Sequence, residues 1–210
     1  MKRIFITVFT AIALICSCDR KAVIRSNAFN EINGHEYVDL GLPSGLKWAT
    51  CNVGASEPEE YGNYFAWGET ESKRTISNKE ILDVLENLDD IGGDLRYDAA
   101  TANWGSSWRM PTKVEIEELI SNCTYKYVIR NGVQGIKLTG LNGNSIFFPA
   151  AGGEWAFENL EGKVGTYWSS TSYGELISYG FSFSLYFLKE GCSIDYIGKA
   201  CKYSIRPVSE

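Results

Sequence analysis

The first eighteen residues constrain this chain more than any other segment. Lys2 and Arg3 precede an uncharged, apolar run over residues 4–15, and Ser17 then stands directly before Cys18. A basic start, an apolar stretch too short to span a bilayer and a small residue before a cysteine are typical of a bacterial lipoprotein signal peptide. We therefore predict that residues 1–17 are removed and that Cys18 is acylated.

This signal predicts a lipid-anchored protein of the cell envelope, most simply at the outer membrane. The protein has no basic block that could bind anionic lipid, so its membrane attachment would come from acyl chains on Cys18. Stable anchoring needs more than one such chain. The mature sequence following the anchor is expected to contain a tether over residues 18–33 and one domain over residues 34–210, since about 190 residues suffice for a single core.

The charge balance excludes one class of partner. The chain has 20 Lys and Arg against 26 Asp and Glu, and removal of Lys2 and Arg3 leaves 18 against 26, a net charge of −8. An acidic surface without a basic patch argues against nucleic-acid binding. We expect a glycan or an envelope protein as the partner.

A single histidine, His35, limits the available chemistry. A histidine-rich zinc site and a histidine-dependent catalytic triad both need more than this chain offers in one place. The acidic loop contains Glu57, Glu59 and Glu60, but the sequence offers no residues that would orient these carboxylates as the paired acid and base of a glycoside hydrolase. We therefore predict no metal, no cofactor and no enzymatic activity.

Two capping boxes predict two helices. Ser77 is followed by Glu80, and Thr112 by Glu115, each before an apolar stripe; the second helix should end near Asn122. The stretch between the helices, from residue 92 to residue 108, is expected to be a long irregular loop.

The rest of the domain has the pattern of strands and tight turns. Strands are predicted over residues 36–40, 46–51 and 63–67, then in a meander over 125–129, 135–139 and 145–148 with a turn at Asn131-Gly132. From residue 179 to 187, aromatic and aliphatic residues alternate with Ser or Gly, which predicts a strand with one buried apolar face. A turn at 189–191, a strand after Cys192 and a closing strand over 203–208 follow. The predicted fold class is α+β, with two helices packed on a twisted antiparallel sheet with long loops.

Four cysteines remain after the predicted processing: Cys51, Cys123, Cys192 and Cys201. In an oxidising compartment an even number suggests disulfides, with three possible connectivities. Cys192 and Cys201 are close in sequence on predicted neighbouring strands, so we predict a Cys192–Cys201 bridge and, by elimination, Cys51–Cys123. Four buried thiols are the alternative.

Six short phrases, taken in order, resemble the Fibrobacter succinogenes major paralogous domain family, which is frequent in lipoproteins of Bacteroidota-type bacteria. The resemblance covers roughly residues 34–208, and the phrases are YVDLGLPSGLKWATCNVG (37–54), YGNYFAWGET (61–70), DAATANWGSSWRMPT (98–112), SIFFPAAGG (145–153), YWSS (167–170) and SIRPV (204–208). The resemblance implies a C-type-lectin-like fold with the strand near Val38 paired to the closing strand near Ile205. It implies no activity.

A C-type-lectin-like fold would carry recognition on its loops. The predicted ligand-binding surface combines aromatic rings with carboxylates from two segments: Glu154, Trp155, Phe157, Glu158, Tyr173 and Tyr179. The triplets of calcium-dependent lectins are absent, so we predict no calcium. Trp48, Trp67, Trp108 and Trp168 are expected to pin loops to the sheet, each with one indole N–H to satisfy.

The function we expect is that of a non-enzymatic binding module for glycans. The alternative is a structural or assembly subunit of an envelope or surface complex, and a remote one is an enzyme like the formylglycine-generating enzymes, which use a cysteine pair to hold copper. Residues 19–22 lack the acidic cluster common in surface-exported lipoproteins, which favours the periplasmic face without fixing the leaflet.

Overall fold

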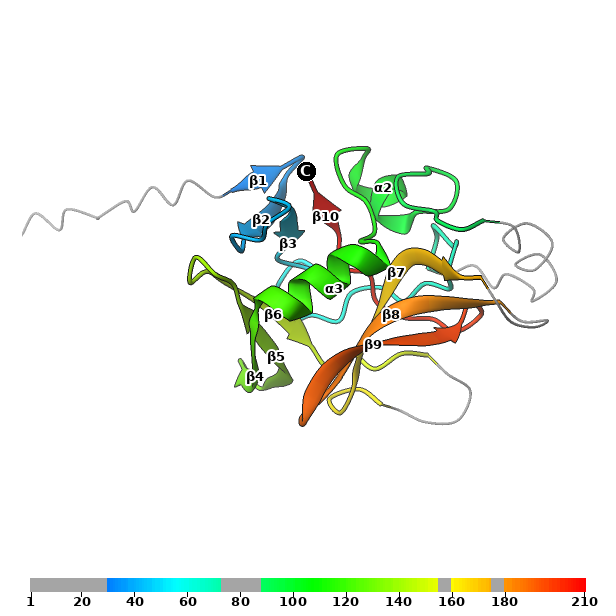
Figure 1. Cartoon of the computed structure of the whole chain (residues 1–210). Coiled ribbons are helices and arrows are strands. Elements are labelled where there is room, and N and C mark those ends of the chain that lie inside the picture. The colour runs from blue at the N-terminus through cyan, green and yellow to red at the C-terminus, as the bar shows by residue number, and fades with distance from the viewer. Residues whose placement is uncertain (1–29, 73–87, 155–159, 175–179) are drawn as a thin grey trace, which may run out of the picture.

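The computed structural model describes residues 30–72, 88–154, 160–174 and 180–210 (Figure 1). In chain order the elements of these residues are β1 (Glu31–Ile32), β2 (His35–Asp39), β3 (Lys47–Ala49), α2 (Ala99–Trp104), α3 (Lys113–Asn122), β4 (Thr124–Arg130), β5 (Val133–Thr139), β6 (Ser145–Pro149), β7 (Gly165–Tyr173), β8 (Phe181–Leu188), β9 (Gly191–Gly198) and β10 (Val208–Ser209).

The α+β prediction is wrong, because the described part of the chain is mainly β, with 41% strand and 10% helix. Its strands form three small antiparallel sheets, in the orders β1-β2-β3-β10, β4-β5-β6 and β7-β8-β9. The strands of different sheets are separated by long loops and do not merge into one twisted sheet. Helix α3 packs across β7, β8 and β9.

The predicted pairing of the first and closing strands is also wrong. β10 pairs with β3, where Val208 is opposite Trp48, and β3 in turn pairs with β2, where Trp48 is opposite Val38. The strand predicted near Val38 is therefore separated from the closing strand by β3.

Helix α3 has the predicted start and end. The Thr112 hydroxyl accepts from the Glu115 N–H at 3.3 Å, and the Glu115 carboxylate accepts from the Thr112 N–H at 2.8 Å. This reciprocal capping box satisfies two N–H groups that have no partner inside the helix. Cys123 follows as the C-cap residue, and its N–H donates to the Leu119 carbonyl.

Helix α2 was not predicted and lies within the supposed irregular loop. Asp98 is its N-cap and is fully buried. One carboxylate oxygen accepts from the N–H groups of Ala100 and Thr101, and the other accepts from those of Gly93 and Met110. A single side chain thus starts the helix and fixes the loops on both sides of it.

The Asn131-Gly132 turn is confirmed. Both residues have positive φ, 48° and 85°, as a two-residue hairpin turn requires. The turn joins β4 to β5, whose pairing runs from Arg130 opposite Val133 to Thr124 opposite Thr139.

The buried apolar residues form two core clusters. The first includes Leu119 of α3 and Phe187 of β8, and the second includes Trp67, Ala99 and Trp168. The four predicted tryptophans are all buried. Three of their indole N–H groups donate to distant carbonyls: Trp67 to Ser169, Trp108 to Ile32 and Trp168 to Phe65. Among the described residues, the Trp48 indole has no acceptor.

The alternation along β8 has a different meaning from the one predicted. Ser182 and Ser184 are completely buried, while Phe181 and Phe183 are only half-buried. The serine face is covered because Ser182 packs against β7 and donates to the Thr171 carbonyl at 2.7 Å. Small hydroxyl side chains therefore fill one side of β8, and two of its aromatic residues face outward.

Three further predictions have mixed outcomes. β1 lies inside the predicted tether, where Ile32 pairs with His35. Residues 63–67 form no strand, only an isolated bridge between Phe65 and Tyr203. The helix predicted from Ser77 falls on residues 73–87, outside the described part of the chain.

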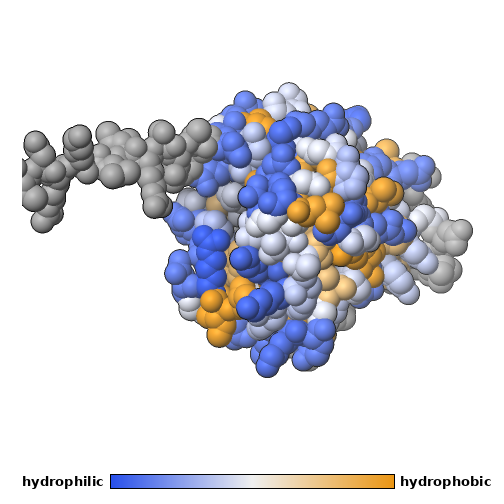
Figure 2. Space-filling model, turned by 60° about the vertical axis from the view of Figure 1, so that its left-hand side comes forward, coloured by the Kyte–Doolittle hydropathy of each residue, from blue (hydrophilic) through white to orange (hydrophobic). Residues whose placement is uncertain are grey.

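The face turned forward in Figure 2 carries hydrophilic side chains over most of its area, and its hydrophobic side chains form separate patches. Such a surface is ordinary for a protein exposed to water. Within the described ranges, no helix is long and apolar enough to cross a membrane.

Candidate ligand-binding site

The structure describes two of the six predicted binding residues. Trp155, Phe157, Glu158 and Tyr179 lie outside the described residues, as does the predicted lipidation site Cys18. Glu154 is exposed and pairs with Lys202, just beyond the end of β9. Tyr173 is the last residue of β7 and lies opposite Phe181, which is itself opposite the last residue of β9. Tyr173 thus lies at the end of β7, whereas Glu154 follows Gly152, which pairs with Gly165 at the start of β7.

Tyr173 belongs to a group of four aromatic residues that we call the aromatic face: Tyr173, Phe181, Phe183 and Tyr196. The pairing register puts them on one side of the sheet, since Tyr173 is opposite Phe181 and Phe183 is opposite Tyr196. Three of these residues were not predicted as part of a site. The alternation along β8 had suggested instead that its aromatic residues were core.

The rings of the aromatic face contact one another. Tyr173 and Tyr196 are stacked with centroids 4.7 Å apart and planes 9° from parallel. Phe183 meets Tyr173 edge-on at 5.2 Å, and Phe181 meets Tyr196 edge-on at 5.9 Å. These are the offset and edge-to-face geometries that aromatic pairs prefer, so the rings hold one another in place.

The aromatic face is partly exposed because α3 begins at its edge and does not extend over it. Farther along the same side of β8, Leu185 and Phe187 are buried in the core beneath α3. Lys113 is the first residue of α3, and its ammonium lies 4.8 Å from the centre of the Phe183 ring. Beyond Lys113 the rings are only partly covered, and Tyr196 is 52% exposed.

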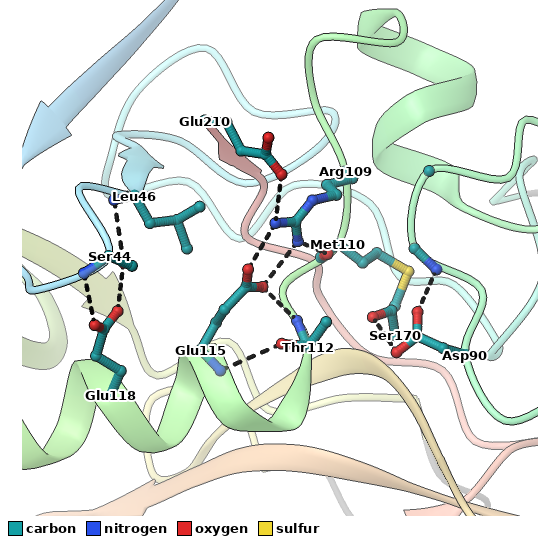
Figure 3. Close-up of polar contacts among 12 residues, drawn as sticks. Ser44, Leu46, Asp90, Arg109, Met110, Thr112, Glu115, Glu118, Ser170 and Glu210 are labelled. Atoms are coloured by element: carbon teal, nitrogen blue, oxygen red, sulfur yellow. Dashed lines mark hydrogen bonds and ion pairs between the residues drawn. The ribbon is translucent and has the colours of Figure 1, made fainter.

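A polar network fastens the start of α3 to β7 and so fixes this boundary, and Figure 3 draws its contact between Ser170 and Asp90. The Lys113 N–H donates to the Thr171 hydroxyl at 3.1 Å, and the Ser170 N–H donates to the Pro111 carbonyl at 2.8 Å. The hydroxyls of Ser170 and Thr171 both donate to Asp90. The edge of the aromatic face is thus held by hydrogen bonds that do not depend on a ligand.

A separate set of contacts at the start of α3 joins Arg109, Glu115 and Glu210. Arg109 makes two hydrogen bonds to the Glu115 carboxylate, at 2.6 and 2.8 Å, and also reaches Glu210 (Figure 3). Burial alone would raise the pKa of Glu115, but the hydrogen bonds and charge of Arg109 and the hydrogen bonds to Thr112 outweigh it and hold the pKa below its usual value.

Polar groups surround the rings of the aromatic face. The hydroxyls of Tyr173 and Tyr196 belong to the face itself, the Lys113 ammonium stands at its edge, and Glu117 holds that ammonium at 3.1 Å. A surface of this kind offers ring planes for stacking together with hydrogen-bond donors and acceptors. It is suited to binding, and it contains no nucleophile with an activating base.

Away from the aromatic face, a groove of about 390 Å³ contains the single histidine. It lies between the β1–β2 hairpin, the end of β3 and α2, and its lining includes His35, Cys51, Glu57 and Trp104. His35 stacks on Trp104 with ring centroids 3.7 Å apart, and burial lowers the pKa of its imidazole. Burial raises the pKa of the Cys51 thiol, whose neighbour is the Thr50 hydroxyl at 3.7 Å.

The predicted disulfides are not present. Cys51, Cys123, Cys192 and Cys201 are all free thiols. Cys192 is the second residue of β9, whereas Cys201 follows the far end of that strand, so about 20 Å of extended chain separates Cys192 from Gly198. Because a disulfide needs Cα atoms within about 7 Å, the structure does not support the Cys192–Cys201 bridge. The same separation prevents these two cysteines from holding one copper ion.

Within the described ranges, no three His, Cys, Asp or Glu side chains are grouped so that they could hold a metal ion. Comparison of the chain with family models, curated proteins and solved structures finds no match. The site must therefore be interpreted from its own geometry.

Proposed function

We propose that this protein is a lipid-anchored binding module of the cell envelope and that the aromatic face binds glycans. The observation that carries the proposal is the group of four contacting rings on one side of the β7-β8-β9 sheet, of which Tyr196 is exposed and Tyr173 was predicted as a binding residue. The family resemblance and the signal peptide remain predictions that agree with it.

The chemistry of the face favours a sugar over a purely apolar ligand. A pyranose ring has apolar C–H faces that pack on an aromatic plane and hydroxyl groups that need hydrogen-bond partners. Tyr173 and Tyr196 offer both a ring and a hydroxyl, and Lys113 with Glu117 adds a charged donor and acceptor. Tyrosine also suits such a role because its side chain loses little conformational freedom on binding.

The position of the face suits an anchored protein. In Figure 1 the chain enters the domain at β1 on one side, and the end of β7 lies on the opposite side. An anchor at Cys18 would hold the β1 side toward the membrane and leave the aromatic face turned toward soluble or cell-wall glycans.

A glycan array followed by titration of the strongest hit tests the proposal. We expect Tyr196→Ala and Phe183→Ala to weaken binding about tenfold or more, equivalent to about 1.4 kcal/mol. Tyr37→Ala is the matched control, since Tyr37 is a half-buried aromatic residue on β2, away from the face. Trp155→Ala shows whether the predicted loop contributes.

Glycan binding that survives both face variants would place the site elsewhere. An array without any hit, with and without calcium, would overturn the glycan proposal and favour a protein partner in an envelope complex. The anchor is tested separately: Cys18→Ala should move the protein from the detergent-rich to the aqueous phase, and a variant that still partitions with detergent would contradict the lipoprotein prediction.

A further inference from the structure

Cys123 and Cys192 come from distant parts of the chain to one place in the fold. Cys123 is the C-cap residue of α3, and Cys192 is the second residue of β9, opposite Phe187. Both side chains are half-buried and pack against the same core cluster, which includes Leu119 and Phe187. α3 itself packs on β9.

A neighbouring contact ties the same two regions together. Tyr125 lies two residues after Cys123 on the same side of the extended chain, and its hydroxyl donates to the Leu188 carbonyl. Leu188 follows Phe187, the residue paired with Cys192. The contact therefore holds the start of β4 against the β8–β9 hairpin, next to both thiols.

The electrostatics of the thiols agree with this proximity. Burial first, and then the neighbouring Cys192, raises the pKa of Cys123 to about 11. Burial and then Cys192 likewise raise the pKa of Tyr125. Cys51 and Cys201 lie elsewhere, in the groove beside Thr50 and next to the second core cluster.

We infer that Cys123 and Cys192 are the pair that forms a disulfide when the protein meets an oxidising thiol–disulfide partner, leaving Cys51 and Cys201 reduced. This connectivity differs from both predicted bridges. It requires no glycan binding and stands whether or not the aromatic face is a sugar site.

The reaction is two successive thiol–disulfide exchanges. One cysteine thiolate attacks a small disulfide, forms a mixed disulfide and releases one small thiolate. The second cysteine thiolate attacks the protein sulfur of that mixed disulfide, closes the Cys123–Cys192 bond and releases the second small thiolate. Two protein thiols are oxidised, the small disulfide is reduced to two thiols, and the two protons pass to the released thiolates.

Oxidised glutathione is the probe, applied to the reduced full-length protein in detergent at pH 9, where more of each thiol is ionised than at pH 7. Trypsin places the four cysteines in four different peptides, covering residues 48–73, 114–126, 190–199 and 200–202. The expected product under non-reducing conditions is 114–126 linked to 190–199, two hydrogens lighter than the sum of the peptides.

Serine variants provide the controls. Cys51→Ser and Cys201→Ser, alone and together, should leave the linked peptide unchanged, whereas Cys123→Ser and Cys192→Ser should abolish it. Oxidation should also raise Tm by about 5–10 °C in the wild type and in the Cys51→Ser, Cys201→Ser double variant, with no rise in Cys192→Ser.

Recovery of Cys123 and Cys192 as thiols or as separate glutathione adducts would overturn the inference. So would a dominant link to 200–202 or to 48–73. Because the decisive result is obtained with the wild-type protein, a variant that fails to fold does not decide the question.

Discussion

Replacing Asp98 removes one buried carboxylate that accepts hydrogen bonds from four backbone N–H groups. One oxygen lies 2.8 and 3.1 Å from the nitrogens of Ala100 and Thr101, and the other lies 2.8 and 2.9 Å from those of Gly93 and Met110. Asp98→Ala deletes both oxygens. Asp98→Asn keeps one oxygen and turns an NH₂ group toward the other pair of donors.

The magnitudes follow from these partners. Loss of the N-cap costs about 1 kcal/mol. Each buried N–H left without an acceptor costs about 1–3 kcal/mol, and the Met110 site is fully buried while that of Gly93 is partly exposed. We therefore expect Asp98→Ala to lower the free energy of unfolding by about 4 kcal/mol and Asp98→Asn by about 2–3 kcal/mol.

Urea unfolding followed by tryptophan fluorescence measures both values, because several tryptophans are buried in the core. Asp89→Asn is the matched control at an exposed position of the preceding loop and should change stability by less than about 0.5 kcal/mol. An Asp98→Ala variant as stable as the wild type would refute the role of the carboxylate. Equal losses in Ala and Asn would refute the division between its two oxygens.

Two further predictions concern α3 and a close backbone approach. Glu115→Gln should cost about 1–2 kcal/mol at pH 7. Because the folded pKa of Glu115 lies below its unfolded value, this contribution is present above the unfolded pKa and is lost as the pH falls through the folded pKa. Wild type and variant should therefore converge in urea unfolding as the pH is lowered, and a difference that stays constant with pH would contradict the ion pair. Gly140→Ala should destabilise the protein by about 1–3 kcal/mol, since a Cβ there would lie 2.0 Å from the Leu40 carbonyl oxygen. In the control Gly191→Ala the new Cβ meets no atom within 4 Å, so its Tm should be nearly that of the wild type. Similar Tm values for the two variants would show that the Leu40 backbone moves to accommodate the methyl group.

The local features of the fold could be predicted from sequence. The Thr112–Glu115 box and the Asn131-Gly132 turn depend on residues within a few positions of one another, and both appear as expected. α2 was missed although its cap is local, since Asp98 accepts from the N–H groups of Ala100 and Thr101. Only the hydrogen bond of Asp98 to Met110 depends on a distant part of the chain.

The non-local features could not be predicted. Ser182 and Ser184 are buried because β7 packs beside them, and Phe183 faces outward because α3 begins at Lys113 and does not cover it. Arg206 is buried and donates to the carbonyls of Ala49, Thr50 and Phe147, partners that lie far from it in sequence. Burial lowers the pKa of this guanidinium. The aromatic face follows from such long-range arrangements, so only Tyr173 of its four members was predicted as a site residue.

The segment over residues 202–209 sets the order of events during synthesis. It pairs with Glu154 through Lys202, with Phe65 through Tyr203, and with Arg109 and Trp48 through Val208. All of these partners leave the ribosome earlier and cannot form these pairs until residues 202–209 have been synthesised. Contacts of such long sequence separation slow folding, so the nascent chain should remain incompletely folded until these residues emerge.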